Sequence, residues 1–135
     1  MNATLLVTDD SMIIREMIKD IARTAGWEIV GEAANGLEAV QQYQLLKPVA
    51  VTLDLTMPEY DGLYALRGIR DFDPNAQVLV VSAIDQAAVI KEAIDLGAAD
   101  FIVKPFDHSR LQRAIQLLAQ RKGAATRAQP CLQNN

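Results

Sequence analysis

Short apolar runs alternate with segments of helical periodicity along most of this chain. The runs predict strands over residues 5–7, 27–33, 49–53, 77–82 and 99–103. Between the runs, apolar residues recur at spacings of three and four, which is the period of an amphipathic helix. This alternation predicts one α/β domain, in which helices cover both faces of a five-stranded, doubly wound parallel sheet.

Local signals predict where the helices begin and end. Ser11 can cap the first helix, and Gly97 can end the fourth, which is expected over about 85–96. The last helix is expected from about Asp107 to Arg121, with Asp107 or Ser109 as its cap. The apolar period is lost beyond Gly123. We therefore predict a domain over residues 1–121 and a flexible tail over 122–135.

Polar side chains follow the ends of four predicted strands. Asp9 and Asp10 follow the first run, Asp54 the third, Ser82 the fourth and Lys104 the fifth. Because the carboxyl ends of parallel strands meet at one edge of a sheet, these residues should share a pocket, where open α/β folds bind ligands. Three carboxylates, a hydroxyl and an ammonium suit a divalent cation and a phosphoryl group.

The residue types in this pocket suggest separate roles. Asp54 is the candidate nucleophile, since a carboxylate can attack a phosphoryl group to form an aspartyl phosphate. Ser82 offers a hydroxyl donor to one phosphoryl oxygen, and Lys104 offers an ammonium to another. A bound Mg²⁺ would relieve the repulsion among Asp9, Asp10 and Asp54.

Composition narrows the remaining classes of function. The chain has 135 residues and a net charge of −4, and its 13 basic residues are spread along its length, so we expect no nucleic-acid binding. No apolar run approaches the ~20 residues that span a bilayer, and the start of the chain lacks the pattern of a secretory signal. We therefore expect a cytoplasmic protein with no membrane segment. The single cysteine, Cys131, excludes an internal disulfide.

Several short motifs together resemble a known family. The chain is similar to the receiver domain of bacterial two-component response regulators, in particular the single-domain chemotaxis (CheY-like) regulators, over residues 4 to about 121. The resemblance rests on residues 7–11, 53–58, 61–62, 81–83 and 104–106. It implies a flavodoxin-like sheet with the strand order 2-1-3-4-5 of that family.

The resemblance also implies a mechanism. Asp54 would take a phosphoryl group from a phosphohistidine on a sensor histidine kinase. Mg²⁺ would be held by Asp10, Asp54, the backbone carbonyl of Thr56 and, through water, Asp9. The bond between Lys104 and Pro105 would be cis. The protein would then catalyse no reaction other than its own phosphorylation and dephosphorylation.

The family further implies a switch. The hydroxyl of Ser82 would move toward the phosphoryl group, and the ring of Phe101 would change rotamer with it; a plain core aromatic is the alternative for Phe101. The output surface would include residues near Ala88, Lys91, Glu92 and Phe101, together with the last helix. Because the apolar side chain of Ile84 cannot orient an attacking water, we expect slow self-hydrolysis of the phosphoryl group.

The sequence is compatible with more than one function. Signalling by protein contact could target a flagellar motor switch, a histidine phosphotransfer protein, or a kinase or phosphatase, and the stretch 100–106 favours chemotaxis. A Mg²⁺-dependent phosphohydrolase with an aspartate nucleophile would need a second carboxylate where Thr56 stands. A receiver that acts without phosphorylation is a third possibility, although such proteins tend to lose residues of the acidic pocket.

Overall fold

The structure of this chain is a computed structural model, which describes residues 3–83 and 85–127, with side chains described as far as Leu118. The prediction about Ile84 and the part of the predicted tail beyond Arg127 lie outside the described residues.

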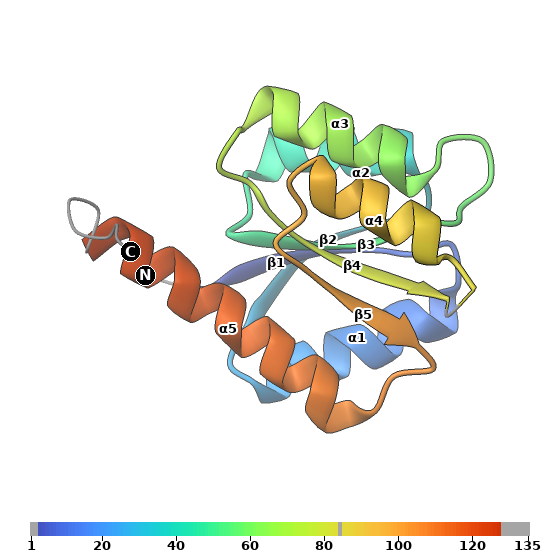
Figure 1. The fold of residues 1–135 in the computed structure, drawn as a ribbon. Helices are drawn as coiled ribbons and strands as arrows, with labels where there is room; N and C mark the ends of the chain where they lie inside the picture. The colour runs from blue at the N-terminus through green and yellow to red at the C-terminus, as the bar shows by residue number, and fades with distance from the viewer. Residues whose placement is uncertain (1–2, 84, 128–135) are drawn as a thin grey trace.

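Five strands and five helices alternate along the chain, as the apolar pattern predicts (Figure 1). The strands are β1 (Thr4–Thr8), β2 (Glu28–Ala33), β3 (Ala50–Asp54), β4 (Gln77–Ala83) and β5 (Asp100–Lys104). The helices are α1 (Met12–Thr24), α2 (Gly36–Leu46), α3 (Gly62–Phe72), α4 (Ala87–Asp95) and α5 (His108–Arg127). All neighbouring strands pair in parallel, in the order β2-β1-β3-β4-β5, so the expected doubly wound fold is confirmed.

The helices form two layers, one on each face of the sheet. Helices α1 and α5 cover one face, and α2, α3 and α4 cover the other (Figure 1). Alternate residues of β3 serve the two layers: Ala50 packs with the α1 and α5 side chains, whereas Val51 and Leu53 pack with those of α2 and α3. Every residue of β3 is buried, which is typical of a central strand covered on both sides.

The helix ends follow the local signals in the sequence. The Ser11 side chain accepts a hydrogen bond from the backbone N–H of Ile14 and so caps α1. At α5, Asp107 is the residue that caps, because its carboxylate accepts from the backbone N–H of Ser109. Gly97 follows α4 with a φ of 107°, a left-handed conformation that favours glycine.

Three details differ from the sequence prediction. Helix α5 continues to Arg127 instead of ending near Arg121. Met17 and Ile94, which the spacing of apolar residues by three and four places on the inward faces of their helices, are 43% and 41% exposed. Both lie at the margin of an apolar stripe, since each is roughly 70–80° from its centre at 100° per residue, and the sheet covers only the centre of the stripe.

Among the described helices, none has the length and apolar composition needed to cross a bilayer.

Candidate functional site

The predicted polar residues gather at the carboxyl edge of the sheet. Asp54 is the last residue of β3 and pairs with Val81 of β4, and Ser82 is the next residue of β4. Lys104 ends β5, where it pairs with Ala83. Because all neighbouring strands are parallel, they end on the same side of the sheet, as the arrows of β4 and β5 show in Figure 1, and the loop carrying Asp9 and Asp10 leaves β1 on that side.

Three carboxylates form the centre of this site. Asp9, Asp10 and Asp54 each offer one carboxylate oxygen, and these atoms lie within 4.8 Å of one another. Asp9 and Asp54 are 0% and 4% exposed, whereas Asp10 is open to solvent. The set is made only of hard oxygen donors and is open on one side, which suits Mg²⁺ with some of its waters retained.

Lys104 is the cation already present in this cluster. Its Nζ lies 2.8 Å from Asp9 Oδ2 and 3.4 Å from Asp54 Oδ2. Burial lowers the pKa of Lys104, but the hydrogen bond to Asp9 and the charge of Asp54 outweigh burial, so the pKa lies above its usual 10.5. Lys104 therefore stays charged and balances only part of the negative charge.

Asp54 carries the most perturbed carboxylate. Burial, followed by the negative charge of Asp9, raises its pKa from 3.8 to about 6, against the opposing effects of Lys104 and of the Thr56 backbone N–H. That N–H donates to Asp54 Oδ1 at 3.1 Å and orients the carboxylate. A buried carboxylate with this environment is a candidate functional group, and a cation or phosphoryl group in the site would relieve its repulsion with Asp9.

Ser82 presents a hydroxyl with unused hydrogen-bonding capacity. The side chain is fully buried, and its Oγ has no hydrogen-bond partner within the described part of the chain. A buried hydroxyl without a partner has a free-energy cost that an incoming oxygen ligand would remove. Phe101, by contrast, is 37% exposed, so the alternative that it is a plain core aromatic is wrong for this conformation.

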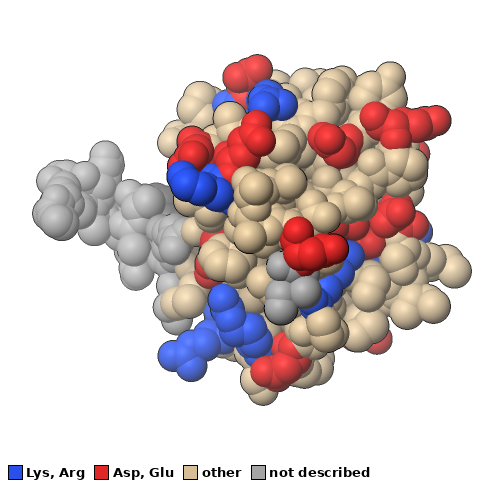
Figure 2. Space-filling view, turned by 45° about the vertical axis from the view of Figure 1, so that its right-hand side comes forward, with Lys and Arg blue, Asp and Glu red and all other residues tan. Residues whose placement is uncertain are grey.

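Charged side chains are distributed unevenly on the face shown in Figure 2. Acidic groups are scattered over the upper and right-hand parts of that view, with basic groups beside several of them and a further basic cluster at the lower left.

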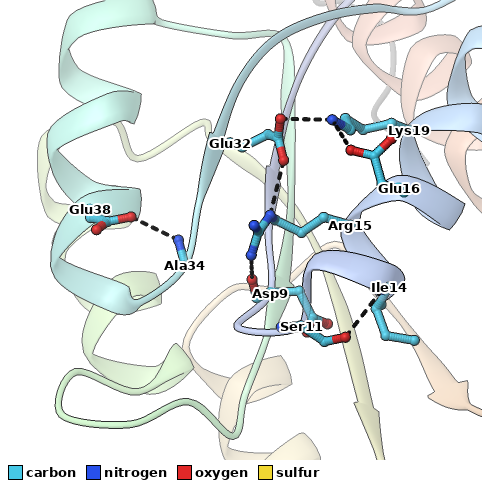
Figure 3. Close-up of polar contacts among 9 residues, drawn as sticks. All are labelled: Asp9, Ser11, Ile14, Arg15, Glu16, Lys19, Glu32, Ala34 and Glu38. Atoms are coloured by element: carbon cyan, nitrogen blue, oxygen red, sulfur yellow. Dashed lines mark hydrogen bonds and ion pairs between the residues drawn. The ribbon is translucent and has the colours of Figure 1, made fainter.

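Sequence reasoning missed two residues beside the pocket, Arg15 and Glu32. Arg15 Nη1 donates to the backbone carbonyl of Asp9 at 2.7 Å, and its Nε lies 2.9 Å from Glu32 Oε1 (Figure 3). Helical periodicity places Arg15 only on the polar side of α1. No local sequence pattern indicates a contact with a carbonyl six residues earlier in the chain.

Comparison with known proteins decides the family. The family model of the response regulator receiver domain matches residues 5–116. The chain belongs to this family. It is a receiver domain of the CheY-like response regulators, and thus a signalling protein of a kind distinct from ordinary enzymes. Receiver domains bind Mg²⁺ at an acidic pocket, and the Asp9, Asp10 and Asp54 cluster could hold such an ion.

Relatives of known name are similar over nearly their whole length. The chain is 48% identical to the chemotaxis protein CheY of Thermotoga maritima over 120 residues, which cover 89% of this chain and 100% of that protein. It is 50% identical to CheY of Listeria monocytogenes over 116 residues, covering 86% of this chain and 98% of that protein. Both relatives are chemotaxis proteins, and each is matched over nearly its whole length.

Solved structures are similar to the fold described above. CheY from the CheX-CheY-BeF3-Mg complex of Borrelia burgdorferi matches with 38% identity and a TM-score of 0.79, over 84% of this chain and 87% of that one. The receiver domain of AraT from Geobacillus stearothermophilus matches with 29% identity and a TM-score of 0.87, over 94% of this chain and 100% of that one.

Proposed function

We propose that this CheY-like receiver accepts a phosphoryl group on Asp54 from a phosphohistidine of a sensor histidine kinase, and signals by protein contact in chemotaxis. The observation that carries the proposal is the environment of Asp54. This carboxylate is 4% exposed, has a pKa of about 6 and lies at the sheet edge with Asp9 and Lys104. A location in the cytoplasm stays a prediction.

The residues of the pocket fit a resident Mg²⁺. Asp10, Asp54 and the backbone carbonyl of Thr56 would hold the ion, with Asp9 acting through water. The mutual distance of the three carboxylates and the raised pKa of Asp54 support this assignment, because a dication would relieve the repulsion between buried negative charges. When bound, Mg²⁺ would offset negative charge on the oxygens of the transferring phosphoryl group.

The protein groups then have the following roles. A carboxylate oxygen of Asp54 forms a bond to phosphorus, while the bond from phosphorus to the histidine nitrogen breaks and the imidazole leaves with its electron pair. Lys104 Nζ, 3.4 Å from Asp54, donates to one phosphoryl oxygen, and the unpartnered hydroxyl of Ser82 donates to another. Asp9 keeps the Lys104 ammonium in place through their 2.8 Å ion pair.

The output would pass through Ser82 and Phe101. Movement of the Ser82 hydroxyl toward the phosphoryl group would leave room for the Phe101 ring, now 37% exposed, to turn inward. The partner surface would include Ala88, Lys91 and Glu92 of α4, all exposed, together with α5. A phosphoryl mimic should therefore shift backbone amide signals within residues 84–118, and an unchanged spectrum there would count against this switch.

The partners proposed are a sensor histidine kinase upstream and a flagellar motor switch or a histidine phosphotransfer protein downstream. The CheY of Borrelia burgdorferi with similar structure was solved in a complex with CheX, and this supports a partner protein for the present receiver. Slow self-hydrolysis of the phosphoryl group, expected from Ile84, stays a prediction. Ile84→Glu should speed the decay severalfold.

Intact-mass measurement after incubation with acetyl phosphate tests the acceptor. The wild type should gain one phosphoryl mass with Mg²⁺ and none with a chelator, and Asp54→Asn should gain none in either condition. An exposed-site variant, Asp71→Asn, serves as the matched control and should behave as the wild type. Equal labelling of the Asp54→Asn protein would contradict the proposal.

A further inference from the structure

Asp9 is held at four separate points. Its backbone N–H donates to the carbonyl of Ala33 at 3.1 Å, and its backbone carbonyl accepts from Arg15 Nη1 at 2.7 Å. Its carboxylate accepts from the Ser11 backbone N–H at 2.9 Å and from Lys104 Nζ at 2.8 Å. Of these contacts, only the one from Arg15 comes from a side chain outside the acidic pocket.

Arg15 is itself fixed by a chain of ion pairs along α1 and β2 (Figure 3). Its Nε lies 2.9 Å from Glu32 Oε1, and Glu32 Oε2 lies 2.7 Å from Lys19 Nζ, which also contacts Glu16 at 2.6 Å. The side chains of Arg15 and Lys19 are only 16% and 8% exposed. The hydrogen bond from Lys19 lowers the pKa of Glu32, so Glu32 remains ionised opposite Arg15.

The Arg15 contact has a direct consequence for Asp10. The carbonyl of Asp9 and the N–H of Asp10 belong to one planar peptide group, so a bond that fixes the carbonyl also fixes the direction in which the chain enters Asp10. Within the described residues, the Asp10 side chain has no hydrogen bond or ion pair of its own. Its placement near Asp9 and Asp54 therefore depends on the backbone.

We infer that Arg15, held by Glu32, is a positioning residue that aims the Asp9–Asp10 peptide so that the Asp10 carboxylate faces the metal position. This inference rests on the proposed Mg²⁺ site. Arg15 touches neither the reacting atoms nor any carboxylate of the pocket, and acts through the Asp9 carbonyl alone. Contacts that support metal ligands in this way commonly change metal affinity when they are removed.

If Arg15 acted only through its charge, its removal would change the Mg²⁺ affinity in the opposite direction. A guanidinium near the pocket repels a dication, so its removal would strengthen Mg²⁺ binding if charge were its only effect. Loss of positioning would weaken Mg²⁺ binding instead. Arg15→Met and Arg15→Lys therefore separate the two roles, because the lysine variant keeps the charge but loses the planar fork that reaches both the carbonyl and Glu32.

Calorimetric titration of the unphosphorylated protein with Mg²⁺ tests the inference. Arg15→Met should raise the Kd about tenfold, and Arg15→Lys, which loses the fork but keeps the repulsive charge, should raise it at least as much. Arg67→Met is the matched control, because Arg67 also forms a 2.9 Å ion pair, with Glu92, but has no such contact with Asp9, Asp10 or Asp54 among the described residues. That variant should leave the Kd unchanged.

The metal-free proteins give a second measurement that does not depend on activity. The backbone amide signal of Asp10 should shift in both Arg15 variants and stay in place in Arg67→Met, and urea unfolding verifies that each variant is folded. A Kd that is unchanged or lower in Arg15→Met would overturn the role of Arg15 and leave the metal site intact. A wild type that binds no Mg²⁺ would overturn the metal site and this inference together.

Discussion

Replacing Asp54 by asparagine should stabilise the metal-free protein. The wild-type carboxylate is 4% exposed and shares its surroundings with the negative charge of Asp9. Asparagine has nearly the same shape and can still accept the hydrogen bond from the Thr56 backbone N–H, which is 3.1 Å from Oδ1 in the wild type. The substitution therefore removes a buried charge while leaving most contacts in place.

The expected increase in the free energy of unfolding follows from the pKa of Asp54. The pKa is about 6 in the folded protein and 3.8 when unperturbed, and each pH unit of this difference corresponds to about 1.4 kcal/mol. The expected gain is thus about 3 kcal/mol, a value that already includes the favourable contact with Lys104 at 3.4 Å.

The gain should depend on pH in a defined direction. Because the folded protein holds the Asp54 proton more tightly than the unfolded chain, this residue makes the wild type less stable as pH rises from about 4 to about 6. Asparagine does not titrate. The difference between the two proteins should therefore be near zero at pH 4 and reach its full value above pH 6.

Urea unfolding at several pH values, with chelator present, measures this difference. Asp71→Asn is the control for loss of an exposed carboxylate, and should change stability by less than about 0.5 kcal/mol. Mg²⁺ should reduce the difference in the free energy of unfolding between Asp54→Asn and the wild type, because it should stabilise only the wild type. The reasoning is refuted if Asp54→Asn is no more stable than the wild type at pH 7.5, or if its gain is the same at pH 4.

Three other substitutions have expected outcomes. Ser82→Ala should leave the free energy of unfolding within about 0.5 kcal/mol of the wild type, because no bond is lost, while the rate of labelling by acetyl phosphate falls severalfold. Gly97→Ala should destabilise by about 1–2 kcal/mol in urea unfolding, because φ is 107° and because the Arg70 guanidinium, 2.6 Å from the new Cβ, has to move away. Tyr43→Phe should cost about 1–2 kcal/mol in the same assay, because it removes the 2.8 Å hydrogen bond from a buried hydroxyl to Asp73.

Each of these three predictions has a control variant or a result that would contradict it. Gly26 also has a positive φ, of 92°, but nothing lies within 4 Å of the position that a Cβ would take. Gly26→Ala should therefore lower the free energy of unfolding through backbone strain alone. Equal losses at Gly26 and Gly97 would show that the Arg70 contact is unimportant. Labelling of Ser82→Ala at the wild-type rate would count against the role of Ser82, and an unchanged stability of Tyr43→Phe would contradict its buried hydrogen bond.

The parts of the site that the sequence predicts are those fixed by strand ends. Asp54 and Lys104 follow apolar runs, and parallel pairing alone brings such positions to one edge. The strand order came from the family resemblance, since periodicity does not say which strands are neighbours. The extension of α5 to Arg127 was missed because weak periodicity does not mark a helix end.

Contacts that join one helix or strand to another could not be predicted from the sequence. The bond from Arg15 to the Asp9 carbonyl depends on the angle at which α1 leaves β1, and the Glu32 partner depends on the pairing of β2 with β1. Burial of Asp54, which raises its pKa, likewise comes from helices on both faces of the sheet. Such features appear only when the elements are placed in three dimensions.

Locating the phosphoryl group in the chain tests the central claim most directly. After labelling with acetyl phosphate and Mg²⁺, borohydride converts an aspartyl phosphate to homoserine, and peptide mass spectrometry then identifies the altered residue. The account predicts homoserine at position 54 and unchanged aspartate at Asp9 and Asp10. Reduction at either of those residues, or an unreduced Asp54 in protein that carries the phosphoryl mass, would contradict it.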